Sequence, residues 1–208
     1  MSNELINTLN KKDAADALID LGEVVVDSFV DSDILSDIPI LGTLAKLKNV
    51  GVSVSDYFFV KKLQKFIFAL SSVSDSERND FFTRMSSDTE LQSRVNDNLM
   101  LLINATDDID KPKLLGQIFA SYIRHRISYE KFMKYSTSVN GMNSSQLGML
   151  KSQTERKVER EAGHAMATFG LVIISIPTTA GSSSPEYYLN EDGAEYLNIL
   201  YGTEVSFS

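Results

Sequence analysis

The feature that most constrains the fold is residues 111–135, where a helical apolar pattern coincides with the densest positive charge in the chain. Apolar side chains recur there at the spacing of one broad helix face. They are Leu114, Leu115, Ile118, Phe119, Tyr122 and Ile123. Six basic residues in this segment stand against one glutamate, whereas the whole chain has a formal net charge of −8. We therefore predict two linked helices that carry a basic surface suited to binding.

The composition is that of a folded protein, with 43% hydrophobic and 23% charged residues in 208. This length can supply one sizeable core or two small ones. The chain contains no cysteine, which fits a reducing cytoplasm, and its opening residues lack the basic-then-apolar order of a signal peptide. The longest apolar run, Ile38–Val54, is interrupted by Lys46 and Lys48 and is shorter than the ~20 residues of a spanning helix. We expect a cytoplasmic protein without a membrane span.

A second amphipathic helix is predicted for residues 13–30, with an acidic stripe along one side. The stripe consists of Asp13, Asp16, Asp20, Glu23 and Asp27. One interpretation is a solvated polar face. The other is a docking face for the basic segment, within one chain or between two, because like charges three and four residues apart repel one another. The predicted partner-binding residues are this acidic stripe together with Arg124, Arg126, Lys131 and Lys134.

Further helices fill the region up to residue 138, which we assign to a multi-helix bundle domain. Apolar periodicity predicts a core helix over residues 57–70. Two capping boxes, Ser74 with Glu77 and Ser87 with Glu90, predict the next two helix starts. A cluster of aspartates precedes residue 111, and we interpret its members as turn and helix N-terminal charges rather than metal ligands. These aspartates are Asp107, Asp108 and Asp110.

The composition changes after Tyr135 to a Ser/Asn/Gly-rich stretch, STSVNGMNSSQLG, which we interpret as a linker. A second domain is therefore expected over residues 139–208. Its predicted order is a helix over residues 144–169, a strand over 171–176, a turn, a strand over 187–189 and a final helix capped by Asn190. The fold class is mainly α, with a small α+β unit after the bundle.

The motifs GLVIISI and YYLNEDGAEYL resemble the strand, wing and last-helix entry of winged-helix domains, with Asn190 in place of the usual threonine. The resemblance implies that residues 154–169 form the helix that reads DNA in that family. Its nucleic-acid-binding residues would be Lys151, Arg156, Lys157 and Arg160. Glutamates alternate with these bases and the unit is acidic overall, which weakens attraction to phosphate. We therefore expect the winged-helix shape to serve protein contacts.

Residues 34–135 resemble uncharacterised bacterial and phage-borne helical proteins, through the segments IPILGT, KKLQKF and LLGQIFASYI. Such proteins occur in accessory and phage-defence contexts, which implies a protein partner and brings no catalytic residues. His125 and His164 have no set of metal-type ligands around them, and phosphate-loop, dinucleotide and hydrolase-elbow motifs are absent from the sequence. We expect neither an enzyme nor a cofactor or metal.

The function predicted from the sequence is that of an intracellular protein-binding or regulatory module. One alternative is a winged-helix DNA-binding regulator. A second is a membrane-surface effector that uses Ile38–Val54. Homodimerisation through exposed aromatic and methionine side chains is a further expectation.

Overall fold

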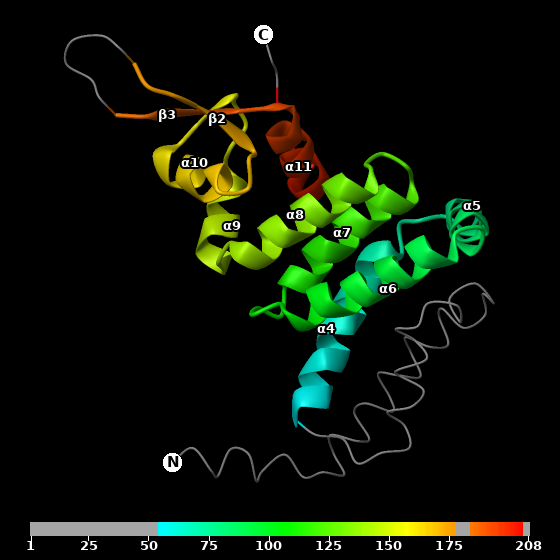
Figure 1. The fold of residues 1–208 in the computed structure, drawn as a ribbon. Coiled ribbons are helices and arrows are strands. Elements are labelled where there is room, and N and C mark those ends of the chain that lie inside the picture. The colour runs from blue at the N-terminus through cyan, green and yellow to red at the C-terminus, as the bar shows by residue number, and fades with distance from the viewer. Residues whose placement is uncertain (1–53, 178–183, 206–208) are drawn as a thin grey trace, which may run out of the picture.

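A computed structural model describes residues 54–177 and 184–205 (Figure 1). At its centre lie α7 (Lys111–Ile123) and α8 (Tyr129–Gly141), which confirm the two linked helices predicted from the apolar pattern. Pro112 occupies the first turn of α7, and Ser128 caps α8 by accepting a hydrogen bond from the backbone N–H of Lys131. The most constrained stretch of the sequence is therefore the centre of the fold.

Helix α4 (Val54–Leu70) packs along α7. The two backbones approach closely at Gly116, where an added Cβ would lie 2.5 Å from the Phe66 carbonyl oxygen. Two further helices, α5 (Asp75–Ser86) and α6 (Thr89–Asn104), complete this end of the molecule. Figure 1 shows α5 and α6 on the side of the molecule away from the strands. All regular elements that the structure describes before residue 138 are thus helices.

The two predicted capping boxes have different outcomes. Ser74 and Glu77 cap α5 reciprocally, as predicted. The second box is wrong, because Asp88 and not Ser87 is the N-cap of α6, accepting a hydrogen bond from the Leu91 N–H at 2.9 Å. Helix α5 continues to Ser86, so Ser87 becomes its C-cap and its hydroxyl donates to the Arg84 carbonyl.

The C-terminal part contains a three-stranded antiparallel sheet and three helices. The elements are α9 (Ser144–Leu150), β1 (Lys157–Val158), α10 (Arg160–Ala167), β2 (Val172–Ser175), β3 (Glu186–Leu189) and α11 (Glu191–Tyr201). The strand order is β1-β3-β2, and the register places Ile173 opposite Tyr188 and Val158 opposite Tyr187. The predicted hairpin and the Asn190 cap of α11 are confirmed.

Two sequence predictions for this part are wrong. The expected linker after Tyr135 is helical, because α8 continues to Gly141 and α9 begins at Ser144. The expected helix over residues 144–169 is two helices with β1 between them. Buried Gln153 holds this break, donating to the Met149 carbonyl at 3.1 Å and accepting from the Glu159 N–H at 3.0 Å. Val158 is then buried against the sheet instead of continuing a helix.

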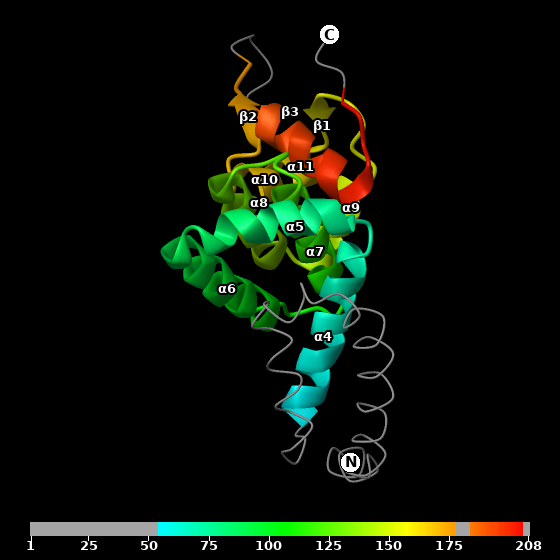
Figure 2. The same cartoon turned by 90° about the vertical axis from the view of Figure 1, so that its right-hand side faces the viewer.

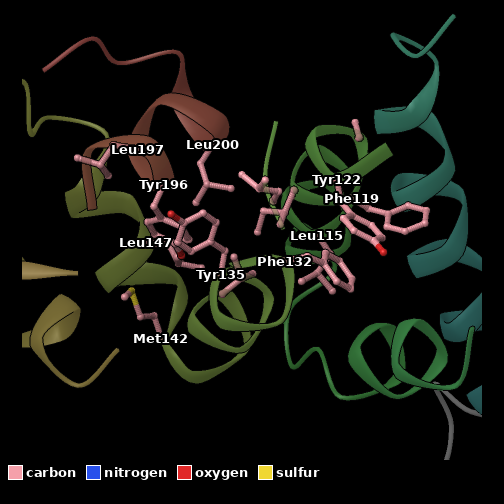
Figure 3. Close-up of a cluster of buried hydrophobic side chains, with 14 of the residues drawn as sticks. Leu115, Phe119, Tyr122, Phe132, Tyr135, Met142, Leu147, Tyr196, Leu197 and Leu200 are labelled. Carbon is pink, nitrogen blue, oxygen red and sulfur yellow. The ribbon is translucent and has the colours of Figure 1, made fainter. Parts of the chain in front are cut away.

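One cluster of buried apolar side chains extends from Leu63 to Leu200. Figure 3 shows Phe119, Tyr122 and Phe132 together on one side of it, and Tyr135 with Tyr196 on the other. The cluster includes residues before and after residue 138, which lies inside α8. The described part is therefore a mainly helical fold with one small sheet, and its division into two domains at residue 138 stays a prediction.

Candidate functional site

Two of the predicted basic residues belong to a polar network between α8 and α11. Lys131 Nζ lies 3.0 Å from Asp192 Oδ1 and 2.8 Å from Glu195 Oε2, and Lys134 Nζ lies 2.7 Å from Asp192 Oδ2. The Tyr135 hydroxyl donates to Glu195 Oε2 at 2.6 Å. Lys131 and Lys134 are three residues apart on α8, and Asp192 and Glu195 are three residues apart on α11. The basic pair on one helix therefore faces the acidic pair on the other. Lys131 and Lys134, which the sequence predicted to bind a partner, therefore form ion pairs within the chain.

The network fixes the ionisation of its members. The hydrogen bond from Lys134 lowers the pKa of Asp192, and the hydrogen bond to Glu195 raises the pKa of Lys131. Burial and the contact with Glu195 raise the pKa of Tyr135, so its hydroxyl remains a donor. All three shifts favour the states present at neutral pH. The arrangement attaches α11 to α8 and shows no group poised to exchange a proton with a substrate.

Substituting Asp192 should therefore change how stability depends on pH. Because the pKa of Asp192 is lowered in the folded protein, its contribution is complete above the ordinary value of 3.8 and is lost as pH falls through the lower folded value. We expect Asp192→Asn to lower the melting temperature at neutral pH and to approach wild type as pH falls below 3.8 and through the folded pKa. Thermal melts across that range measure the difference.

Glu191→Gln is a matched control for this prediction. Glu191 is exposed in the same first turn of α11, and its side chain makes no hydrogen bond or ion pair with the described residues. Its curve should run close to that of wild type throughout. If the melting temperature of Asp192→Asn lies below that of wild type by the same amount at neutral and acidic pH, the ionisation of Asp192 does not contribute to stability.

The other two predicted basic residues lie near the C-terminal end of α7. Arg124 Nε lies 3.2 Å from Glu77 Oε1, and the same guanidinium donates to the Ser72 hydroxyl at 3.2 Å and to the Ser72 carbonyl. Arg126 is exposed, and its side chain makes no hydrogen bond or ion pair with any described residue. The acidic stripe from Asp13 to Asp27 falls outside the described residues. Its pairing with the basic segment therefore stays a prediction.

The residues of the DNA-binding alternative do not share one helix face. Lys157 lies on β1 and pairs with Glu186 Oε1 at 2.6 Å, while Lys151 follows α9 with its ammonium 5.9 Å from the Tyr201 ring. Arg156 precedes β1, and Arg160 begins α10. The expected reading helix over residues 154–169 is wrong, since α10 is eight residues long and a strand precedes it. The four basic side chains thus point from different elements.

Two of the three aspartates before α7 form ion pairs with lysines. Asp107 Oδ1 lies 2.5 Å from the Nζ of buried Lys111, and Asp110 pairs with Lys65. The hydrogen bond from Lys111 lowers the pKa of Asp107, and Asp108 accepts from the backbone N–H of Asp110 at 2.8 Å. Within the two described ranges, no group of three His, Asp or Glu side chains is arranged to hold a metal ion. This cluster anchors the start of α7 to α4.

An apolar surface that sequence reasoning missed lies along β2. Ile173 and Ile174 on β2, an outer strand of the sheet, are 51% and 53% exposed, and Ile176, directly after the end of β2, is 67% exposed. We call residues 172–176 the β2 edge. Residues 171–185 contain no charged side chain. Figures 1 and 2 show the hairpin extending from the end of the molecule opposite α4. A continuous apolar run predicts a buried strand, so this exposure could not be predicted from the sequence.

The described helices include none with the length and apolar character needed to cross a bilayer. All but the last residue of Ile38–Val54, the segment of the membrane-surface alternative, falls outside the described part of the chain. Comparison with protein-family models, with curated proteins and with solved structures gives no match to this chain.

Proposed function

We propose that this protein is a non-enzymatic protein-binding module, and that its β2 edge accepts an extended apolar segment of a partner protein. The observation that carries the proposal is the exposure of three isoleucines, two on an outer strand and one directly after it. Soluble proteins protect such edges with lysine, proline or a covering element, because unpaired strand groups and apolar side chains together attract another strand. Pairing with a partner strand uses the edge and covers its side chains.

The charge of the hairpin favours a protein partner over nucleic acid. A wing that contacts DNA relies on basic side chains, whereas residues 171–185 carry none and Lys157 on β1 is paired with Glu186. The chain as a whole is acidic, with a formal net charge of −8. An uncharged edge lets an apolar segment approach without desolvating a charge. The lack of cysteine fits a cytoplasmic site of action as an accessory of a larger assembly.

Lysine substitutions along the β2 edge test this proposal. Ile173→Lys and Ile176→Lys should each reduce capture of the specific partner from source-cell lysate by about tenfold or more, because a lysine on an edge strand opposes pairing. Leu101→Lys is the matched control, since Leu101 is 66% exposed on α6, far from the hairpin. Quantitative mass spectrometry compares the three variants with wild type, and the binding is then repeated with the purified partner.

Two results decide the outcome. Proteins lost with both β2 variants and retained with Leu101→Lys support the edge as the contact. Equal capture by all four forms would exclude it. Circular dichroism should show the same helix content in each form, because the substituted side chains are more than half exposed.

A further inference from the structure

A groove of about 280 Å³ lies between the C-terminal half of α7 and α11. The facing side chains come from one side of each helix: Gln117, Ser121 and Arg124 from α7, and Glu195 and Asn198 from α11. The end of α4 and the residues that follow α7, including Arg126, complete the walls. This volume is near the lower limit of small-molecule sites and suits a compact ligand.

Polar side chains lie at each end of the groove. Gln117 Nε2 donates to the Leu200 carbonyl, which places Gln117 beside the C-terminal end of α11. Arg124 is seven residues further along α7, an axial rise of about 10 Å. Glu195, more than one turn before Leu200 on α11, also lines the groove. Between these two ends, the wall of the groove is apolar and consists of Ala120, Ile127 and Ile199.

The cations in and around the groove differ in whether they form an ion pair. Arg124 is matched by Glu77, and Lys131 and Lys134 are matched by Asp192 and Glu195. Arg126 is the remaining cation of this group, because it has no hydrogen bond or ion pair within residues 54–177 and 184–205. The Arg126 guanidinium is therefore not paired with a carboxylate of the described residues. A monoanion would balance it.

At the other end of the groove, the side chain of Gln117 lacks a hydrogen-bond partner for its carbonyl oxygen. Gln117 Oε1 is buried and accepts no hydrogen bond from the described residues. The hydrogen bond of Gln117 Nε2 to Leu200 is long, at 3.4 Å, so the side-chain amide is weakly held. An unpaired buried acceptor is unfavourable, and a small rotation of this amide toward the groove would let a ligand N–H or O–H satisfy it.

We propose that this groove binds a small organic monocarboxylate that also carries a neutral hydrogen-bond donor. The carboxylate pairs with Arg126 beside Arg124, and the donor satisfies Gln117. The carbon skeleton between them packs on Ala120, Ile127 and Ile199. A phosphate monoester fits less well, because its charge of about −1.5 to −2 exceeds the single charge of the unpaired Arg126.

Titration of the isotope-labelled protein, followed by its backbone and side-chain amide resonances, tests the proposal. The probe is N-acetylglycine, which has the carboxylate and an amide N–H. Propionate keeps the charge and lacks the donor, and N-acetylglycinamide keeps donors and lacks the charge. A ligand of this size should bind in about the millimolar range. N-acetylglycine should shift the Gln117 side-chain amide and bind about tenfold or more tightly than either analogue.

Arg126→Gln should weaken the binding of N-acetylglycine by about tenfold or more, because the charge-assisted contact is lost. Lys113→Gln removes the same charge from an exposed site at the start of α7 and should leave the affinity within about twofold. The proposal is overturned if the groove resonances do not move, if Arg126→Gln binds as wild type does, or if propionate or N-acetylglycinamide binds as tightly as N-acetylglycine. None of these outcomes depends on the β2 edge.

Discussion

Replacing Phe132 by alanine is expected to lower the free energy of unfolding by about 3–5 kcal/mol. The ring of Phe132 is fully buried, and its centroid lies 5.4–6.0 Å from the centroids of the Tyr122, Phe119 and Tyr129 rings. Truncation removes apolar area and aromatic contacts and leaves a cavity between α7 and α8 (Figure 3). Urea denaturation followed by circular dichroism measures the loss.

Phe132→Leu is the matched control for this experiment. It retains most of the buried volume, so its cost should be clearly smaller than that of alanine. If both variants unfold at the urea concentration of wild type, the aromatic cluster does not hold the two central helices together.

Gly116→Ala is expected to destabilise the protein by about 1–3 kcal/mol or more, although alanine is the better helix former. An added Cβ would lie 2.5 Å from the Phe66 carbonyl oxygen and 2.6 Å from the Ala69 Cβ, so α4 and α7 would have to separate. Backbone atoms cannot yield as a flexible side chain can. The same denaturation experiment measures this cost.

Gly148→Ala makes the same chemical change where space is available. Gly148 lies within α9, and an added Cβ there meets no heavy atom within 4 Å. This variant should be neutral or more stable by up to about 1 kcal/mol, because alanine reduces the entropy of the unfolded chain. Stabilisation by both substitutions would contradict the close crossing of α4 and α7.

The elements that could be predicted are those set by local chemistry. The apolar period of residues 111–135 gave α7 and α8, because a helix with one broad apolar face has few other ways to bury it. Ser74 with Glu77 and Asn190 could be assigned as caps, since a cap bonds amides two or three residues away. The hairpin followed from β-branched residues around a turn-forming stretch.

The elements that were missed depend on distant contacts. Val158 is in a strand because it pairs with Tyr187, and no pattern in the residues around Val158 predicts that pairing. Asp88 replaces Ser87 as the cap of α6 because α5 continues to Ser86 and uses Ser87 as its own C-cap. From the sequence, Lys131 and Lys134 were predicted to bind a partner. In the structure, α11 places Asp192 and Glu195 beside them. The matched three-residue spacing of these acids and bases was the available signal.

Site-specific photo-crosslinking in the source cells tests most directly whether the β2 edge binds a partner protein. A photoreactive side chain at position 176 should give a discrete covalent adduct, which a second substitution, Ile173→Lys, should abolish. The same side chain at position 101, equally exposed on α6, should give no such adduct. An adduct with a second copy of this chain would identify a homodimer. No adduct at position 176, or the same adduct from both positions, would contradict the proposed contact.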